Sequence, residues 1–394
     1  MFSYKPVLLL LFSLFSLCIA NLPDYRDASL LNSTRTLFGR VEISNPTVPV
    51  APLTTNIFSI GSASTAGGCY SQTETIDDWL QEVVKLHNAV TKAYANSYDD
   101  AGSRLLFTAW MSIQWVYEYG EYDREFSSES LWEKTGERLA AVSQLLNGGG
   151  LVDSLTSAAP WIFCGDAFAS KVPWDQPAKD RNGVEIAKEE DETGTITDYW
   201  TLGSLLPTLA AQSINVAYYI DALKSYMVES KPALCDPNVG PYAVTSRRSY
   251  TSTVQSVSIG THDRFAYFCP RTFDPTGQAK PSDLHSVSSL STSITLIGQD
   301  LDRLLPLSAT LYHELFHITD SDESTRDPFY NLGAASSASL AGNSDVINNP
   351  ESYVYLAMAA YVYQNPPAGA DATLYLEAGL PQKATDAIKN AGQV

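Results

Sequence analysis

Residues 311–318 read Leu-Tyr-His-Glu-Leu-Phe-His-Ile, and this stretch decides how the rest of the chain is interpreted. Its polar residues are His313, Glu314 and His317, and on an α-helix the two imidazoles lie on one face, one turn apart. Imidazoles so arranged suit Zn²⁺, and the adjacent carboxylate suits a general base. The other residues are apolar, so we expect a buried helix whose polar groups need a metal ion as partner.

This His-Glu-x-x-His pattern is a specific signal because the chain contains only five histidines in 394 residues. Pro306 lies just before the apolar segment, in a place that suits the start of a helix. The alternative is a pair of ordinary helix-face histidines with a solvated glutamate. That alternative fits poorly with a segment as apolar as this one.

The first 20 residues have the pattern of a secretory signal peptide (residues 1–20). Lys5 supplies a positive charge, residues 7–19 are largely apolar, and Cys18-Ile-Ala20 fits a cleavage site. The apolar run is shorter than the about 20 residues that a membrane-spanning helix needs. We therefore expect a mature chain that begins at Asn21, is secreted to the extracellular space and has no membrane partner.

Cysteine usage agrees with an oxidising compartment. Beyond the signal peptide the chain contains Cys69, Cys164, Cys235 and Cys269, an even number suited to two disulfides. Four cysteines can pair in three ways, and the sequence does not choose among them. Asn32-Ser-Thr is an acceptor for N-glycosylation.

The chain is strongly acidic, with 44 acidic residues against 25 basic ones and a formal net charge of −19. Such a charge argues against nucleic acid or an anionic membrane as a partner. At 44% hydrophobic and 18% charged residues, the composition is that of a globular protein. We expect a monomer whose partners are protein or peptide substrates.

Hydrophobic periodicity indicates helices, then a small sheet, then further helices. We expect helices over residues 75–94, 104–118, 130–147 and 206–227, and from 301 onward apart from a loop after His317. Strands are expected over residues 161–164, 244–259 and 264–269, with a hairpin over 183–200. The pattern predicts an α+β fold, mainly helical, with a small sheet and a buried active-site helix.

The two ends of the mature chain have little periodicity. Residues 21–66 are rich in Ser, Thr, Pro and Asn, which predicts an extended or propeptide-like lead. Residues 366–394 begin with Pro and small residues and predict a loosely held C-terminal tail. The domain that carries the metal site is therefore expected over residues 67–365.

Two histidines leave a catalytic zinc site short of a third protein ligand. Asp320 and Asp322 follow the helix so closely that the chain has little length in which to fold back. The loop that contains Asp327 is long enough to return, and Glu351 would come from a second helix. The residues alone leave these alternatives open; the acidic candidates are Asp320, Asp322, Glu323, Asp327 and Glu351.

The segment Ser324-Thr-Arg-Asp-Pro-Phe-Tyr330 resembles the Gly-Thr-x-Asp-x-x-Tyr-Gly motif of the aspzincin metalloproteases. This family includes deuterolysins and fungal lysine-specific metallo-endopeptidases. The resemblance implies a zincin-like metalloprotease domain with one Zn²⁺. It also implies Glu314 as general base and Tyr330 as the donor that stabilises the oxyanion. The implied metal ligands are His313, His317 and Asp327.

Cys69 and the helix expected after it are similar to the start of the family's catalytic domain, and two other segments also carry the resemblance. Arg264-Phe-Ala-Tyr-Phe-Cys-Pro270 is similar to the strand that precedes the active-site helix, and Asn349-Pro-Glu-Ser-Tyr353 is similar to an Asn-Ala-Asp-Ser segment of the lysine-specific branch. The second similarity places Glu351 in the substrate-binding pocket. The chain departs from the motif at Ser324 and Asn331, which replace its two glycines. Glu351 also replaces an Asp, so we do not expect strict lysine selectivity.

These observations predict a secreted zinc-dependent endopeptidase. In it, Glu314 would act as general base for a metal-activated water that attacks the scissile peptide bond. One alternative is a secreted, non-catalytic zinc-binding protein on the same scaffold. Another is a zinc peptidase in which Glu351 is the third ligand.

Overall fold

The structure is a computed structural model that describes residues 47–391, except for positions 119, 157, 232, 237–239, 249–256 and 275–285. Its architecture is mixed α and β, as predicted. The signal peptide, the Asn32 acceptor and residues 21–46 of the lead lie outside the described residues and remain predictions. Across the described part of the chain, no helix combines the length and apolarity that crossing a bilayer requires.

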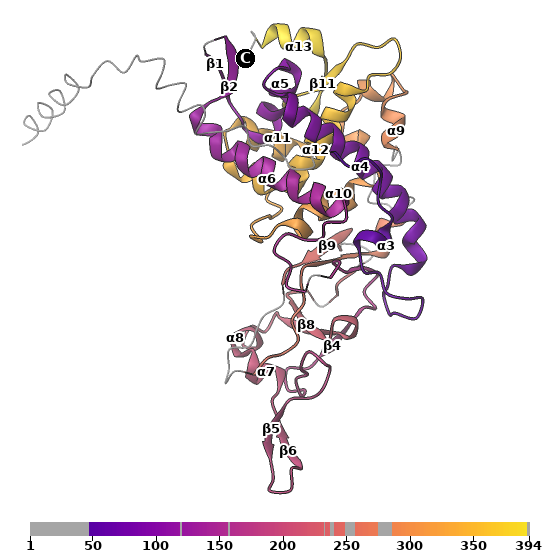
Figure 1. Ribbon diagram of the computed structural model, residues 1–394, viewed down its shortest axis with the longest axis vertical. Helices are drawn as coiled ribbons and strands as arrows, with labels where there is room; N and C mark the ends of the chain where they lie inside the picture. Colours follow the sequence, from indigo (N-terminus) through magenta and orange to yellow (C-terminus); the bar gives the residue numbers. More distant parts are fainter. Residues whose placement is uncertain are drawn as a thin grey trace, which may run out of the picture. The chain divides into compact units, whose positions relative to one another are not determined.

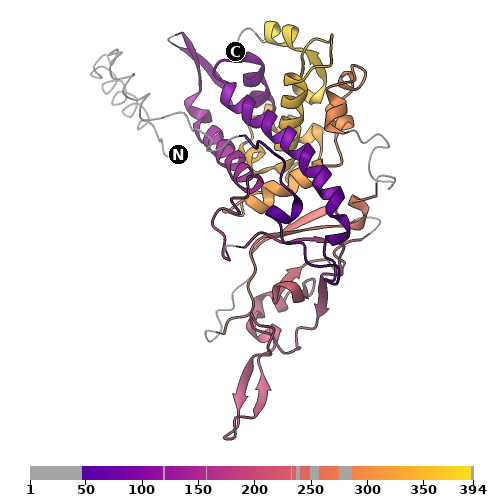
Figure 2. The same cartoon turned by 45° about the vertical axis from the view of Figure 1, so that its right-hand side comes forward.

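Helices form the main core. Helix α10 (Ala309–Thr319) packs against α4 (Thr73–Asn96), α6 (Glu129–Leu146) and α12 (Pro350–Gln364), and Figure 1 shows these helices grouped together. The same grouping is visible in the turned view of Figure 2. Helix α4 buries residues at helical spacing, as its sequence pattern predicts; they include Ile76, Trp79, Leu80, Val83 and Val90. This packing holds α10 inside the core.

Helix α5 (Ala101–Met111) is shorter than predicted. The side chain of Asp100 caps its first turn by accepting a hydrogen bond from the Ser103 N–H. Ser112 then adopts the left-handed conformation (φ 58°), which ends the helix. The prediction of helix up to Glu118 is therefore wrong, because Trp115–Glu118 forms strand β1 and pairs with β2 (Glu121–Arg124).

A three-stranded sheet lies next to α10. Strand β10 (Phe265–Phe268) is central and fully buried; it runs parallel to β3 (Ile162–Cys164) and antiparallel to β9 (Ala243–Ser246). The strands expected over residues 161–164 and 264–269 are therefore confirmed. Of the strand expected over 244–259, the described part contains β9 alone. Because β9 packs against α10, it brings its side chains to the polar face of that helix.

The prediction of a single helix over residues 206–227 is wrong. The region contains two short helices, α7 (Leu202–Leu205) and α8 (Pro207–Ala210), followed by strands β7 (Val216–Ile220) and β8 (Ser225–Glu229). Strand β7 pairs with β8 on one side and with β4 (Ala169–Val172) on the other. The aromatic and β-branched residues of β7 favour a strand, and Lys224 in the left-handed conformation makes the turn between the strands. The hairpin expected over 183–200 is confirmed as β5 (Ala187–Glu190) and β6 (Ile196–Tyr199).

Two disulfides are present, as predicted, and the structure selects their pairing. Cys69 pairs with Cys164, which joins the entry to α4 to strand β3. Cys235 pairs with Cys269, which joins the segment after β8 to the end of β10. Both disulfides therefore link the sheet formed by β3, β10 and β9 to neighbouring segments.

The described part of the N-terminal lead belongs to the core. Val48, Ile57 and Phe58 are buried, and the short helix α3 (Thr54–Ile57) packs against α4. The Thr54 N–H and hydroxyl both donate to the Asp77 carboxylate at 2.6 Å. Residues 47–66 are thus part of the folded domain rather than a separate lead.

The C-terminal segment is also ordered, contrary to the prediction of a loosely held tail. It forms strands β11 (Thr373–Tyr375) and β12 (Pro381–Lys383) and helix α13 (Ala384–Asn390). The Tyr375 side chain is fully buried, and its hydroxyl donates to the Ile297 carbonyl at 2.7 Å. Burial of the Tyr375 side chain therefore attaches the C-terminal segment to the core, although most of the segment's residues are small.

Candidate metal centre

Helix α10 presents the His-Glu-x-x-His residues from inside the core, as predicted. Leu311, Leu315 and Phe316 bury its apolar face. His313 and His317 lie on the opposite face with their ring centroids 5.0 Å apart. His313 is 8% exposed and can therefore act only toward a cleft in the protein.

The loop after α10 brings Asp327 to both imidazoles. The Nε2 atoms of His313 and His317 each lie 3.0 Å from the same oxygen, Oδ1 of Asp327. The ligand atoms of the three residues all lie within 4.8 Å of one another. The structure thus brings together the three residues that the resemblance implies as ligands.

The two nitrogen–oxygen distances are close to those between ligands of one tetrahedral metal ion. Zinc binds imidazole nitrogen and carboxylate oxygen at about 2.0–2.2 Å, so two ligands of one tetrahedral ion are about 3.4 Å apart. The nitrogen–oxygen distances of 3.0 Å need to widen only slightly to admit an ion. The donor set of two imidazoles and one carboxylate is also one that zinc accepts in catalytic sites.

His313 lies between two carboxylates, which gives a second reason to place a cation here. Its Nε2 faces Asp327, and its Nδ1 lies 2.9 Å from Oε2 of Glu351. A neutral imidazole has a single N–H, so one nitrogen would direct its lone pair at a carboxylate. Burial alone would lower the pKa of His313, but hydrogen bonds to Asp327 and Glu351 hold it well above its usual value. The site therefore favours a positive charge, either a proton or a metal ion.

The opposite nitrogens of both imidazoles are held in place. Nδ1 of His313 contacts Glu351 in the first turn of α12, and Nδ1 of His317 lies 3.0 Å from the hydroxyl oxygen of Thr325. Contacts of this kind fix the orientation of an imidazole and leave its other nitrogen for a metal. Glu351 therefore contacts the ring nitrogen of His313 that faces away from Asp327. It does not belong to the group of three residues whose ligand atoms lie close together.

The other acidic candidates are engaged elsewhere. Asp320 accepts the Thr325 N–H at 2.6 Å, Asp322 pairs with Lys134, and Glu323 accepts the backbone N–H of Arg248 at 3.3 Å. These contacts stabilise the loop between α10 and Asp327. None of these three carboxylates contacts the imidazoles in the part of the chain that the structure describes.

Arg138 on helix α6 fixes this loop, and sequence reasoning missed it. Its guanidinium pairs with Asp320 at 3.2 Å and donates to the Ser324 hydroxyl and the Asn348 side chain, both at 2.8 Å. Burial would raise the pKa of Asp320, but Arg138 and the Thr325 N–H hold it below its usual value. No local sequence pattern links a residue of α6 to a loop more than 180 positions away.

The two glycines missing from the motif are explained by local contacts. The Ser324 hydroxyl accepts a hydrogen bond from Arg138. Asn331 caps helix α11 (Leu332–Leu340) by accepting the Ala334 N–H at 2.8 Å. The left-handed residue of this loop is Glu323 (φ 51°), so the chain turns one position before Ser324.

Glu314 faces the same cleft as the imidazoles and is 5% exposed. Its Oε2 accepts a hydrogen bond from the Thr245 hydroxyl at 2.7 Å. Thr245 comes from β9, and sequence reasoning missed it because its strand is rich in Thr and Ser. One hydroxyl thus holds the carboxylate that the sequence predicts as general base.

Tyr330 lies at the open side of the site and is 72% exposed. Its hydroxyl donates to Oδ2 of Asp327 at 3.2 Å. Partial burial and the nearby Asp327 raise the pKa of Tyr330 to about 12, so the phenol keeps its proton at neutral pH. It can therefore serve as a hydrogen-bond donor beside the three ligand atoms.

A cleft of about 750 Å³ gives access to these groups. The cleft is lined by the three predicted metal ligands and Glu314. Residues of strand β9 and of the segment before α10 also line it. The cleft is large enough for several residues of an extended chain.

No protein-family model matches this chain, and no solved structure matches it. The chain is similar to a Penicillium expansum protein described as "Non-secreted LysM effector LysM17", with 26% identity over 119 residues. That match covers 29% of this chain and 16% of the relative's length. A similarity this partial does not establish a family.

Proposed function

We propose that this protein is a secreted zinc-dependent endopeptidase of the aspzincin type, with a zincin-like α+β domain. The observation that carries the proposal is the meeting of His313, His317 and Asp327 beside Glu314 in one cleft. A zinc ion held by those three residues would polarise a substrate carbonyl and lower the pKa of a bound water to about 7. The two disulfides support secretion because such crosslinks persist in oxidising compartments.

Glu314 is the group that moves protons in this proposal. Its carboxylate accepts a proton from the water that attacks the scissile carbonyl and then donates that proton to the leaving amine. The hydrogen bond from Thr245 holds one carboxylate oxygen, which fixes the direction in which the other oxygen points. Tyr330 exchanges its contact with Asp327 for one with the oxyanion that develops on the substrate.

Glu351 takes a different role from the one that the sequence predicts. Because its Oε2 contacts His313, we infer that it mainly orients this imidazole. It also lines the cleft, where its charge is available to a cationic substrate side chain. Substrate binding by Glu351 therefore remains part of the proposal as a secondary role.

Removal of metal tests the proposal directly. We expect casein hydrolysis by the purified protein to stop after treatment with a chelator and to return when one equivalent of Zn²⁺ is added. A control sample receives the chelator already saturated with Zn²⁺, which cannot remove zinc from the protein. Stoichiometric zinc without hydrolysis of any peptide would instead support the non-catalytic zinc-binding protein.

Substitution of Thr245 tests how Glu314 is positioned. We expect Thr245→Val to lower kcat about fivefold, since one hydrogen bond contributes about 1 kcal/mol. Thr245→Ser keeps the hydroxyl and is the matched control, expected to retain most of the activity. Steady-state kinetics with a fluorogenic peptide, together with zinc content, make the comparison. An unchanged kcat in Thr245→Val would show that the contact has no role in catalysis.

A further inference from the structure

The charged residues that line the cleft differ between its two ends. At the end nearer His313 they are acidic: Glu351 contacts His313, and Asp302 accepts a hydrogen bond from Tyr355 at 2.9 Å. Tyr355 and Glu351 both belong to α12 and lie one turn apart. This end therefore presents two carboxylates to a bound chain.

At the end nearer His317 the lining is basic. Arg247, which follows β9, donates to the Thr325 carbonyl at 3.3 Å, and Thr325 contacts His317. Arg326 is the next residue along the same loop, and its side chain is exposed and lines the cleft. Two arginines thus line the cleft next to Thr325, the residue that contacts the second imidazole.

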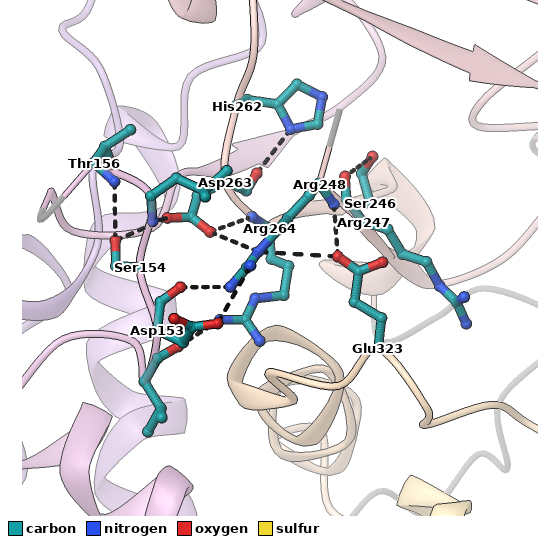
Figure 3. A network of polar contacts seen from close by, with 12 residues as sticks. Asp153, Ser154, Thr156, Ser246, Arg247, Arg248, His262, Asp263, Arg264 and Glu323 are labelled. Carbon is teal, nitrogen blue, oxygen red and sulfur yellow. Dashed lines mark hydrogen bonds and ion pairs between the residues drawn. The ribbon is translucent and has the colours of Figure 1, made fainter. Parts of the chain in front are cut away.

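Glu323, another acidic residue of the cleft lining, is already paired with a different arginine, Arg248. Figure 3 shows Arg248 directed toward Glu323, Asp263 and Asp153, while the side chain of Arg247 extends away from that network. Arg248 Nε lies 4.0 Å from Glu323 and 3.5 Å from Asp263. Arg264 is buried in the same network and donates to the Val152 carbonyl at 2.9 Å. Arg248 and Arg264 are therefore engaged in this network, and Arg247 and Arg326 are the exposed arginines of the described cleft lining.

The other ionisable groups that face this end do not cancel the positive charge. Asp327 is engaged by both imidazoles, and Lys231 adds a further cation to the lining. This basic end is a local exception in a chain with a formal net charge of −19. Such a contrast favours recognition of an anionic group, because a guanidinium binds a carboxylate with two parallel N–H donors.

We infer that the cleft selects peptides that place an acidic side chain at the His317 end, next to Arg247 and Arg326. This inference rests on the proposed peptidase function and adds a substrate class to it. Exposed charge pairs contribute modestly and are screened by salt, so the preference is expected to be about fivefold and to weaken at high ionic strength.

A charge scan tests the inference. A neutral fluorogenic peptide carries a single Glu, Gln or Lys at each of several positions on both sides of the cleaved bond, which mass spectrometry identifies. At one position on one side, we expect Glu to raise kcat/KM about fivefold over Gln, with Lys the poorest. Arg247→Glu and Arg326→Glu are each expected to abolish that order, because the new carboxylate offsets the charge of the remaining arginine. Arg181→Glu changes an exposed arginine outside the cleft by the same charge and is expected to keep the wild-type order.

Peptide affinity provides a second measurement, which does not depend on hydrolysis of the peptide. The zinc-loaded Glu314→Gln variant is titrated with the same peptides, labelled for fluorescence anisotropy, and is expected to bind the Glu peptide more tightly than the Gln peptide. Equal rates and equal affinities for Glu, Gln and Lys peptides at every position would overturn the inference alone. Failure of the zinc-loaded wild type to cleave any peptide would overturn the proposed function and this inference with it.

Discussion

Glu314→Gln is expected to lower kcat for peptide hydrolysis by about 10³-fold or more while the zinc content stays at the wild-type level. The amide has the shape of the carboxylate, and its oxygen still accepts the hydrogen bond from Thr245. It cannot take a proton from water at neutral pH, and loss of a general base costs about 10²- to 10⁴-fold. Steady-state kinetics and metal analysis on the same preparation measure the two quantities separately.

The control for Glu314→Gln is the same chemical change elsewhere in the cleft. Glu323→Gln alters another lining carboxylate, one that contacts Arg248 and not the imidazoles, so we expect most of the activity to remain. If Glu314→Gln keeps wild-type kcat, Glu314 is not the general base. If it loses zinc as well as activity, the residue serves the structure of the site.

The part of the site on α10 was predictable because its geometry is local. A spacing of four residues on a helix places His313 and His317 together, and the apolar residues around them predict burial. Asp327 was different, because its position depends on Arg138 and Asn348, which lie far away in the sequence. Only the resemblance singled it out among the acidic candidates.

The errors in the fold have related causes. Residues 206–227 are apolar without a clear period, and such a run does not distinguish a helix from paired strands. The pairing of β7 with both β4 and β8 decides the matter, and strand partners are not visible in a local pattern. The small residues of the C-terminal segment led to the prediction of a loosely held tail. The segment is instead held by the buried Tyr375, whose hydroxyl donates to the carbonyl of Ile297.

Asp327→Asn is expected to cause the largest loss of zinc among the acidic residues near the site. The carboxylate is shared by both imidazoles, and the amide is a weaker, neutral ligand for a divalent cation. Glu351→Gln removes the negative charge next to Nδ1 of His313. We expect this variant to bind the metal about 10- to 100-fold more weakly.

Competition for zinc with a chromophoric chelator compares the two variants, and Asp322→Asn is the matched control on the same loop. Asp322 pairs with Lys134, away from the imidazoles, so its variant is expected to bind zinc as the wild type does. The order expected for zinc affinity is wild type and Asp322→Asn, then Glu351→Gln, then Asp327→Asn. The reverse order of the last two would make Glu351 the third ligand, and the peptidase would then belong to the class that takes a glutamate from a second helix.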